Sequence, residues 1–282
     1  MDSGYPILIT VDVEDWFQVE NFKPYISFSS WTSRELRIEK NTNNLLELLD
    51  YRKATFFILG WSAERLPRLV REIHARGHEI ASHGYNHKLC THQSPEDLKK
   101  DLADSRKLLE DIIGAQVTGY RAPSFSITND ILKIIEDCGY NYDSSYNSFA
   151  MHGRYGKADM PEKEKNSIAV KISDNFHALP VSNLKIGNRI FPLGGGGYFR
   201  LIPFPFFKAG IRQILKKDKT YLFYMHPWEI DPEQPRVSEA SMNYKFRHYT
   251  NLKRFHLKLS ALFETFSQCR FITCQDYLSD QM

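Results

Sequence analysis

Cysteine is scarce in this sequence, and its spacing excludes the compact zinc sites that paired cysteines form. The 282 residues include four cysteines, and none of them makes a Cys-x-x-Cys pair. Cys269 and Cys274 have no matching second pair that would complete a zinc site. We therefore expect free, buried thiols in a protein of a reducing compartment.

Long hydrophobic runs are also absent. No apolar segment approaches the ~20 residues that a membrane-spanning helix requires. The first six residues lead at once into a strand-like segment, without the basic and apolar regions of a secretory signal peptide. We therefore expect no transmembrane segment, and a soluble protein located in the cytoplasm.

An excess of charge of one sign is missing as well. The chain has 37 Lys and Arg residues against 34 Asp and Glu residues, a formal net charge of +3. This balance gives no support for nucleic acid as a partner, and we expect none. One local basic cluster consists of Lys208, Arg212, Lys216, Lys217 and Lys219. We interpret it as a solvated helix face in preference to a binding site for an anionic partner.

Strand-like and helix-like patterns alternate along the first half of the chain. They follow one another in the order 7–11, 41–52, 54–59, 62–76, 78–82, 94–113, 117–120 and 128–138. This alternation is typical of a parallel α/β sheet or barrel. The rhythm stops after Tyr146 and resumes with a strong strand at 219–225 and an amphipathic helix at 248–267. The length suits one large α/β domain or two small ones.

Polar residues stand directly after five of the strand-like segments. They are two acids, two histidines and an arginine: Asp12, His83, Arg121, Asp143 and His226. The carboxyl ends of parallel strands share one face, and that face holds the active site of such folds. With His87 as a third histidine, these residue types are the ingredients of metal-assisted hydrolysis.

Two short motifs could supply metal ligands. His83 and His87 are four residues apart, so on a helical turn both imidazoles would face one ion. The pattern is weak alone, and polar histidines at a loop-to-helix junction are an equal alternative. Asp12 and Glu14 point the same way if the strand persists, so that one could bind metal while the other acts as a base. Acids at a helix N-terminus are the alternative.

Three further segments carry candidate groups. Arg121 could hold a carboxylate by a bidentate contact, or it could form a structural salt bridge. His226 could be a general acid with Asp143 fixing its tautomer, or a hydrogen-bonded core residue. The four glycines at 194–197 lack the context of a phosphate-binding loop and indicate a tight loop or a close approach of the backbone to a ligand.

Taken together and in order, these motifs resemble those of the NodB-homology polysaccharide deacetylases, carbohydrate esterase family four. The match extends over about residues 7–230 and consists of Asp12 and Glu14, the Ser82-His83 and His87 pattern, Arg121-Ala122-Pro123, Tyr142-Asp143-Ser144-Ser145 and His226. The segments 192–203 and 224–236 resemble the subgroup found in bacterial exopolysaccharide and surface-polysaccharide loci.

The resemblance implies a distorted (β/α) barrel with fewer than eight regular units and a polar site at the C-terminal ends of its strands. It implies one catalytic domain over residues 1–282, with the core motifs in 7–230 and a subgroup-specific C-terminal part in 176–282. The implied activity is removal of N-acetyl groups from N-acetylhexosamine residues of a bacterial surface polysaccharide, exopolysaccharide or precursor. The implied cofactor is a divalent metal ion, usually zinc.

The resemblance also assigns roles to residues. Asp12 is implied as general base, His83 and His87 as metal ligands, and Arg121 as the group that orients Asp12. The backbone N–H of Ser124 is implied as an oxyanion donor, and His226 as general acid with Asp143 as its partner. Many members have two adjacent aspartates, whereas Val13 intervenes here. The metal carboxylate is then Glu14 or Asp15, and we favour Glu14 because it shares a strand face with Asp12.

Two other functions use the same residues. A C–N hydrolase acting on a non-sugar amide or cyclic ureide needs the same site, and a non-catalytic sugar-binding module could retain it in vestigial form. The aromatic-rich loop at 16–31 favours a sugar substrate, because aromatic rings stack on sugar rings. Every polar group of the motifs is present in the sequence, which favours an enzyme over a non-catalytic binding module.

Overall fold

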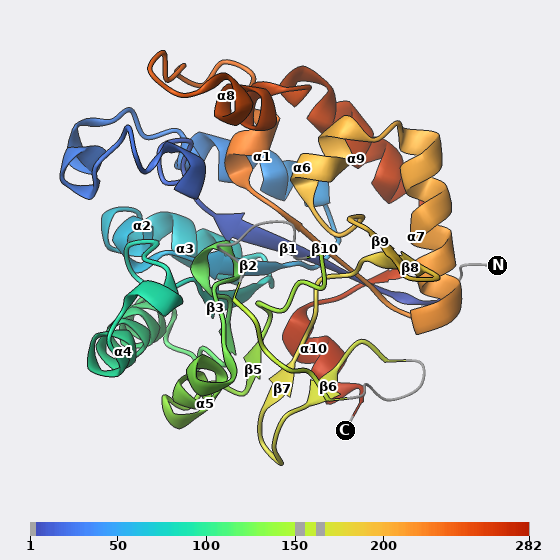
Figure 1. Cartoon of the computed structure of the whole chain (residues 1–282), viewed down its shortest axis with the longest axis horizontal. Helices are drawn as coiled ribbons and strands as arrows, with labels where there is room; N and C mark the ends of the chain where they lie inside the picture. The colour runs from blue at the N-terminus through green and yellow to red at the C-terminus, as the bar shows by residue number, and fades with distance from the viewer. Residues whose placement is uncertain (1–3, 150–155, 162–166, 282) are drawn as a thin grey trace.

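A curled, mostly parallel sheet forms the centre of the structure, and helices cover its outer face (Figure 1). The computed structural model describes residues 4–149, 156–161 and 167–281. The strand order is β10-β1-β2-β3-β4-β5-β7-β6, with β11 also paired to β1. The strands are β1 (Pro6–Val13), β2 (Thr55–Ile58), β3 (Glu79–Ser82), β4 (Gly119–Tyr120), β5 (Tyr142–Asp143), β6 (Val170–Lys171), β7 (His177–Ala178), β10 (Tyr221–Met225) and β11 (Arg270–Phe271).

The sheet curls into a distorted barrel, as the resemblance implied. Among the described strands of this sheet, only β6 pairs in the antiparallel sense. Between β7 and β10 the wall is irregular: the amide of Ser182 donates to the carbonyl of Leu222, and that of Tyr224 donates to Gly194. A separate hairpin, β8 (Leu184–Ile186) and β9 (Arg189–Phe191), lies outside this wall. The expectation of fewer than eight regular β/α units is confirmed.

Helices follow the strands along the chain. They are α1 (Ile38–Leu49), α2 (Gly60–Arg65), α3 (Pro67–Ala75), α4 (Pro95–Ile113), α5 (Asn129–Asp137), α6 (Gly196–Leu201), α7 (Phe204–Asp218), α8 (Met242–Tyr249), α9 (Leu252–Thr265) and α10 (Cys274–Ser279). The helix predicted over 62–76 is two helices, because Pro67 starts a new one and has no N–H to continue the first. None of the helices within the described ranges is both long and apolar enough to span a membrane.

Helix boundaries follow the capping residues of the sequence. The Ser94 hydroxyl accepts a hydrogen bond from the amide of Asp97, and Pro95 opens α4. Gly114 ends that helix with a left-handed φ of 67°. Thr128 caps α5 in the same way, through the amide of Ile131. The four cysteines are free, and Cys138 is partly exposed rather than buried.

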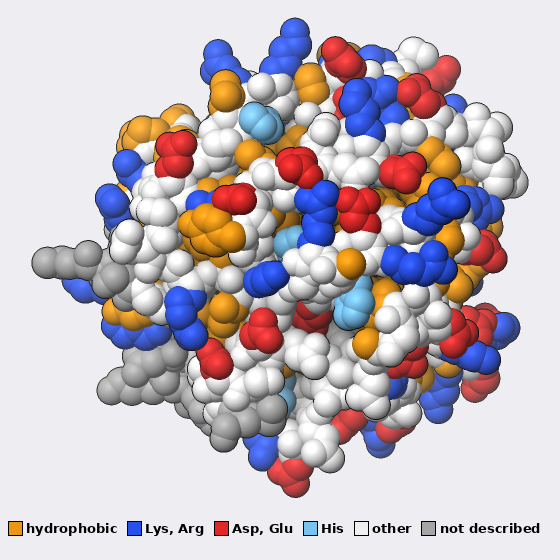
Figure 2. All heavy atoms as spheres, turned by 180° about the vertical axis from the view of Figure 1, so that it is seen from behind, with side chains coloured by type: hydrophobic (Ala, Val, Ile, Leu, Met, Phe, Trp, Pro, Cys, Tyr) orange, Lys and Arg blue, Asp and Glu red, His pale blue; other side chains and the backbone are white. Residues whose placement is uncertain are grey.

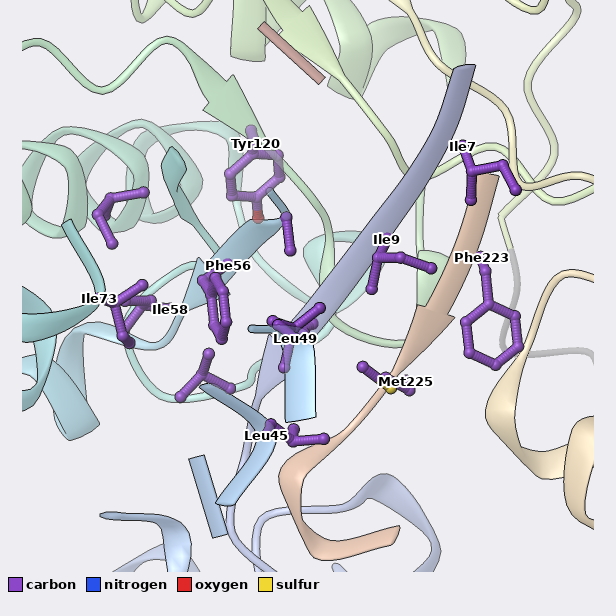
Figure 3. Close-up of a cluster of buried hydrophobic side chains, with 14 of the residues drawn as sticks. Ile7, Ile9, Leu45, Leu49, Phe56, Ile58, Ile73, Tyr120, Phe223 and Met225 are labelled. Carbon is purple, nitrogen blue, oxygen red and sulfur yellow. The ribbon is translucent and has the colours of Figure 1, made fainter. Parts of the chain in front are cut away.

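Apolar side chains fill both faces of the central strands. On β1, Ile7, Ile9 and Val11 point to the helical layer, where they meet helix residues such as Leu45 and Leu49 (Figure 3). The alternate residue Leu8 points into the barrel. Burial on both faces explains why these strands have continuous apolar sequences.

The base of the barrel is closed by α10, which docks on a buried acid. Glu79 accepts hydrogen bonds from the Thr55 hydroxyl at 2.7 Å, the Tyr142 hydroxyl at 2.7 Å and the amide of Gln275 in α10 at 3.1 Å. Burial raises the pKa of Glu79. This acid therefore joins three segments that are remote in sequence.

Replacing Glu79 should destabilise the fold without touching the polar end of the barrel. Glu79→Ala leaves three buried donors without their shared acceptor and is expected to lower the free energy of unfolding by about 2–3 kcal/mol. Glu79→Gln keeps an acceptor oxygen and should cost less. Urea unfolding followed by circular dichroism measures both; an alanine variant as stable as the wild type would show that Glu79 does not fasten α10.

Candidate active site

Five of the polar residues singled out from the sequence meet at the carboxyl end of the sheet. Glu14 follows β1, His83 follows β3, Arg121 follows β4 and His226 follows β10. Asp12 is the last residue but one of β1. Asp12, Glu14 and His226 line one pocket of about 130 Å³ together with His87 and Ser124. The prediction of a polar site on this face is confirmed.

Glu14, His83 and His87 form a buried cluster with the composition of a metal site. Glu14 Oε1 lies 3.0 Å from His83 Nε2 and 2.9 Å from His87 Nε2. One donor atom from each residue lies within 4.8 Å of the others, and the described part of the chain has no second group of this kind. His83 Nδ1 lies 2.7 Å from the carbonyl oxygen of Arg121 and donates to it, so Nε2 is the ring nitrogen that faces Glu14 and could bind a metal ion.

The charge on Glu14 is stabilised by its neighbours. Burial alone would raise the pKa of Glu14, but His87, His226 and the hydrogen bonds from His83 and His87 hold that pKa well below its usual value. Glu14 is therefore an anion at neutral pH. A buried carboxylate beside two imidazole nitrogens is a donor set that fits a divalent transition-metal ion.

The segment between the two histidines is a loop, so the helical turn that we predicted is wrong. Gly84 and His87 have left-handed φ values of 72° and 55°, which a helix does not allow. The carbonyls of Gly84 and Tyr85 accept from the first amides of α2, and the Asp101 carboxylate accepts from the amide of Tyr85. These contacts hold the loop so that His87 returns to Glu14.

Arg121 is wholly buried and contacts Asp12 through one nitrogen. Its Nη1 donates to Asp12 Oδ1 at 2.7 Å and to the Thr10 hydroxyl at 2.8 Å. Nε and Nη2 donate to the carbonyl and hydroxyl of Ser144 at 2.9 and 2.8 Å. The bidentate contact predicted for Arg121 is therefore wrong, because Thr10 and Ser144 take the other donors. Asp12 Oδ2 remains directed to His226, 4.0 Å from its Nε2.

Asp143 is not the partner of His226, which corrects our prediction. Its carboxylate accepts from the amide and the hydroxyl of Ser145, at 2.9 and 2.5 Å. The Ser145 hydroxyl in turn accepts from the amide of Ala122 at 2.7 Å. Burial raises the pKa of Asp143 to about 6. Asp143 thus supports the Arg121-Ala122-Pro123 segment and acts on the site indirectly.

The partner of His226 is Glu229, which the sequence analysis missed. Glu229 Oε2 accepts from the His226 amide at 3.1 Å and lies 3.4 Å from His226 Nδ1. The other oxygen, Oε1, accepts from Nε of the buried Arg200 at 2.9 Å. The i, i+3 spacing to His226 was the only sequence signal for Glu229, and Arg200 had none.

Neighbouring carboxylates keep His226 positively charged. Burial lowers its pKa, but Glu14, Glu229 and Asp12 together outweigh burial and raise the pKa of His226 to about 9. The four-glycine segment makes room for this arrangement, because a Cβ atom on Gly196 would meet Glu229 Oε2 at 2.0 Å. The backbone thus closely approaches a side chain of the protein, and an approach to a ligand stays a prediction.

Asp15, the alternative metal carboxylate, points away from the histidines and caps α1. Its carboxylate oxygens accept from the amides of Trp16, Arg37 and Ile38, at 2.8, 2.8 and 3.0 Å. Burial raises the pKa of Asp15 to about 6, against the opposing effect of these amides. The structure therefore gathers Glu14 with the two histidines and gives Asp15 a helix-capping position.

Ser124 lies on the pocket wall with an amide that is available to a ligand. Ser124 and Phe125 have left-handed φ values of 51° and 58°, so the chain turns sharply after Pro123. Within the described ranges the Ser124 amide has no hydrogen-bond acceptor. This position is compatible with the oxyanion donor that the resemblance implies.

Two larger pockets adjoin the central one. One of about 320 Å³ shares Val19, Glu20 and His87 with it. The other, of about 420 Å³, shares His226 and Trp228 and is walled by residues of α6 and α8. A ligand longer than the reacting group therefore has room on both sides.

The aromatic loop at 16–31 is mainly core, which weakens its use as an argument for sugar stacking. Trp16, Phe17, Phe22 and Trp31 are buried in a cluster that includes Trp61. Phe28 is an exposed exception and lines the 320 Å³ pocket. The aromatic rings on the central pocket come instead from Phe125, Tyr224 and Trp228.

Comparison with known families divides the chain into two adjacent matches. The family model described as polysaccharide deacetylase matches residues 25–142, and a domain of unknown function, DUF3473, matches residues 144–279. A peptidoglycan deacetylase-like protein of Gibberella zeae is 37% identical over 105 residues, 36% of this chain and 31% of its own length. A peptidoglycan-N-acetylglucosamine deacetylase of Bacillus cereus is 34% identical over 101 residues, 35% of this chain and 47% of its own.

The chain thus spans only 31% and 47% of the length of these two curated relatives. Among solved structures, one from Mycobacterium smegmatis assigned to the polysaccharide deacetylases has a TM-score of 0.63 at 18% identity, covering 98% of this chain and 89% of that one. A mutant of a carbohydrate esterase family four pseudoenzyme has a TM-score of 0.52 at 13% identity, covering 99% and 68%. These similarities show the fold.

Metal content should depend on Glu14 and not on Asp15. Glu14→Gln removes the carboxylate between the two imidazoles and is expected to lower zinc affinity by about 100-fold or more, since one of three ligands is lost. Asp15→Asn leaves the cluster intact and should retain zinc, while losing about 1 kcal/mol of stability with its helix cap. Equilibrium dialysis with zinc, followed by elemental analysis, measures the zinc affinity of both variants, and thermal unfolding measures their stability. Loss of zinc in Asp15→Asn alone would make Asp15 the ligand.

Proposed function

Because residues 25–142 match the polysaccharide deacetylase family model, we propose that this protein is a metal-dependent hydrolase that removes N-acetyl groups from N-acetylhexosamine residues. One observation carries the proposal. The Glu14–His83–His87 cluster opens on the same pocket as Asp12 and His226. A metal-binding set, a carboxylate base and a protonated imidazole at one pocket are what amide hydrolysis requires.

Glu14, His83 and His87 would hold the metal ion. Zinc suits a set of two imidazoles and one carboxylate, and we propose zinc on this ground. When bound, the ion polarises the acetamide carbonyl and lowers the pKa of water, which makes water a nucleophile at neutral pH. The donation from His83 Nδ1 to the Arg121 carbonyl fixes the ring for this task.

Asp12 takes the proton of the attacking water in this mechanism. Arg121 Nη1 holds Asp12 Oδ1, which leaves Oδ2 as the oxygen on the pocket side, near His226. Arg121 is itself held by Thr10 and Ser144, so the carboxylate is fixed before the substrate arrives. Such preorganisation removes reorientation from the barrier.

His226 gives its proton to the departing amine, and Ser124 stabilises the oxyanion. Glu229 and Asp12, which lie outside the proposed ligand set, favour the charged form of the His226 ring, and a charged ring donates a proton where a neutral ring donates poorly. The Ser124 amide, from a residue that lines the same pocket, donates to the oxygen of the former carbonyl. Phe125, Tyr224 and Trp228 give apolar surface for the sugar ring.

We propose further that the substrate is an N-acetylhexosamine residue of a bacterial surface polysaccharide or exopolysaccharide, or of its precursor. It is supported by the resemblance of 192–203 and 224–236 to proteins of such loci and by the pockets on both sides of the centre. Hydrolysis of a non-sugar amide and binding without catalysis remain the alternatives. The cytoplasmic location expected from the sequence stays a prediction.

Acetate release tests the proposed function. Zinc-loaded protein should release acetate from N-acetylated bacterial glycans, and Asp12→Asn should lower turnover by ~10²–10⁴-fold because the general base is lost. The variant should keep its zinc, since Asp12 lies outside the ligand set. No release from any N-acetylated saccharide by zinc-replete protein would favour the alternatives, and zinc loss in Asp12→Asn would make Asp12 a ligand.

The pH profile tests the assignment of Glu229 as the partner of His226. Glu229 raises the pKa of His226, so Glu229→Gln should lower that pKa and move the alkaline limb of kcat/KM to lower pH. Arg200 keeps its contacts to the carbonyls of Arg247, His248 and Thr250 in this variant, which supports folding.

Asp143→Asn is the matched control, because Asp143 is also a buried acid near the site but bonds Ser145. Its alkaline limb should stay where the wild-type limb lies, even if turnover falls. Rate profiles over pH for both variants and the wild type measure the difference. A shift in Asp143→Asn without one in Glu229→Gln would restore Asp143 as the partner.

A further inference from the structure

Basic and acidic residues are separated along this chain in a way that net charge conceals. Residues 175–217 and 240–263 contain no Asp or Glu, although the whole chain has 34. The same two segments hold twelve of its 37 basic residues: Lys185, Arg189, Arg200, Lys208, Arg212, Lys216, Lys217, Lys245, Arg247, Lys253, Arg254 and Lys258. The rest of the chain keeps 25 basic and 34 acidic residues, so it is net negative.

Apart from residues 175–183, which include β7 (His177–Ala178) and hold no Lys or Arg, the two acid-free segments form one region of the folded protein. They supply the hairpin β8–β9 and helices α6 to α9, which Figure 1 places together along the top and right of the molecule. Phe199 of α6 packs against Phe207 of α7 at 4.8 Å and Phe255 of α9 at 5.6 Å between ring centroids. Arg200 of α6 donates to the carbonyl of Arg247 in α8. We call this region the basic face.

The basic face also exposes apolar side chains that a protein surface normally hides. Eleven large hydrophobic side chains of the described residues are exposed, and seven belong to the basic face: Ile186, Phe191, Leu201, Phe206, Met242, Phe246 and Leu257. Phe206, Met242 and Leu257 are exposed by 73%, 76% and 69%. From behind, Lys and Arg side chains lie beside apolar ones along the upper and left margins (Figure 2).

We propose that the basic face docks on the surface of a membrane that contains anionic lipids. The exposed Lys and Arg residues attract the anionic headgroups, and each one near the surface raises affinity about fivefold. Arg200 is buried against Glu229 and takes no part in this attraction. Apolar side chains on the same face enter the boundary between headgroups and acyl chains, as in interfacial helices. This combination distinguishes a lipid surface from a soluble polyanion, which would use the charges and leave the apolar side chains in water.

Docking would place the site beside the membrane. The 420 Å³ pocket is walled by Leu201, Phe246 and Arg247 of the basic face and by His226 of the site. A saccharide carried on a lipid could therefore reach His226 while its carrier stays in the membrane. The proposal itself does not depend on the proposed function, because binding is measured without substrate.

Vesicle sedimentation tests the proposal with the full chain. The protein should bind phosphatidylcholine vesicles with roughly 30 mol% phosphatidylglycerol and should bind pure phosphatidylcholine vesicles at least about tenfold more weakly. Raising the salt concentration should weaken binding, because it shortens the screening length. Equal binding to both vesicles, or none to either, would overturn the proposal.

Two triple variants separate the charged and apolar contributions. Lys216→Gln, Lys217→Gln and Lys253→Gln together should weaken vesicle binding by about tenfold or more. Phe206→Ser, Met242→Ser and Leu257→Ser together should also weaken it, by a similar factor. The matched control removes three exposed lysines from α4 and α5, at the opposite side of Figure 1, and should bind as the wild type does: Lys99, Lys107 and Lys133 to Gln.

The soluble acidic polysaccharide heparin is the competing partner. If the protein binds heparin but not the anionic vesicles, the basic face serves a polyanion and the lipid proposal is wrong. If the serine variant binds vesicles as tightly as the wild type, no apolar contact with the membrane exists and the proposed docking is also wrong. Unchanged far-UV circular dichroism in every variant shows that the fold is intact.

Discussion

The buried guanidinium of Arg121 joins the parts of the candidate site to one another. The guanidinium donates to Asp12 and Thr10 on β1 and to Ser144 after β5. The backbone carbonyl of Arg121 accepts a hydrogen bond from His83. A charged side chain without solvent is stable only when each donor has an acceptor. Asp12, His83 and two strand ends are consequently fixed relative to one side chain, which makes the geometry of the candidate site a property of the barrel.

The second half of the chain completes this site from the other side. It supplies His226, and it supplies the Glu229–Arg200 pair that surrounds His226 with charge. A further pair ties the two halves together, since Arg37 before α1 binds Asp231 close to Glu229, while Asp15 caps α1 from the end of β1. The segments matched by the two family models thus contribute to one pocket.

Much of this arrangement was predictable from the sequence, for identifiable reasons. Strand-end positions identified Asp12, His83, Arg121 and His226 because an apolar strand and a parallel sheet fix where its carboxyl end lies. The choice of Glu14 over Asp15 agrees with the positions in the structure, but the reason given for it does not, because β1 ends at Val13 and the Glu14 amide donates to the Asp12 carbonyl in a turn.

The errors concern contacts between segments distant in sequence. Glu229 and Arg200 are 29 residues apart, and no local pattern signals a pair that forms only when α6 packs against β10. Asp143 lay at the expected strand end but found a nearer partner in Ser145. His87 reaches Glu14 through a loop whose left-handed residues depend on Asp101 and α2, which no spacing rule describes.

The central claim is that Glu14, His83 and His87 bind one divalent ion beside Asp12 and His226. Anomalous diffraction at the zinc edge from crystals of the zinc-loaded protein tests it directly. The account predicts one strong peak about 2.0–2.2 Å from a Glu14 oxygen and from Nε2 of both histidines. A peak coordinated by Asp15, or an ordered cluster of the three side chains without an ion at saturating zinc, would contradict it.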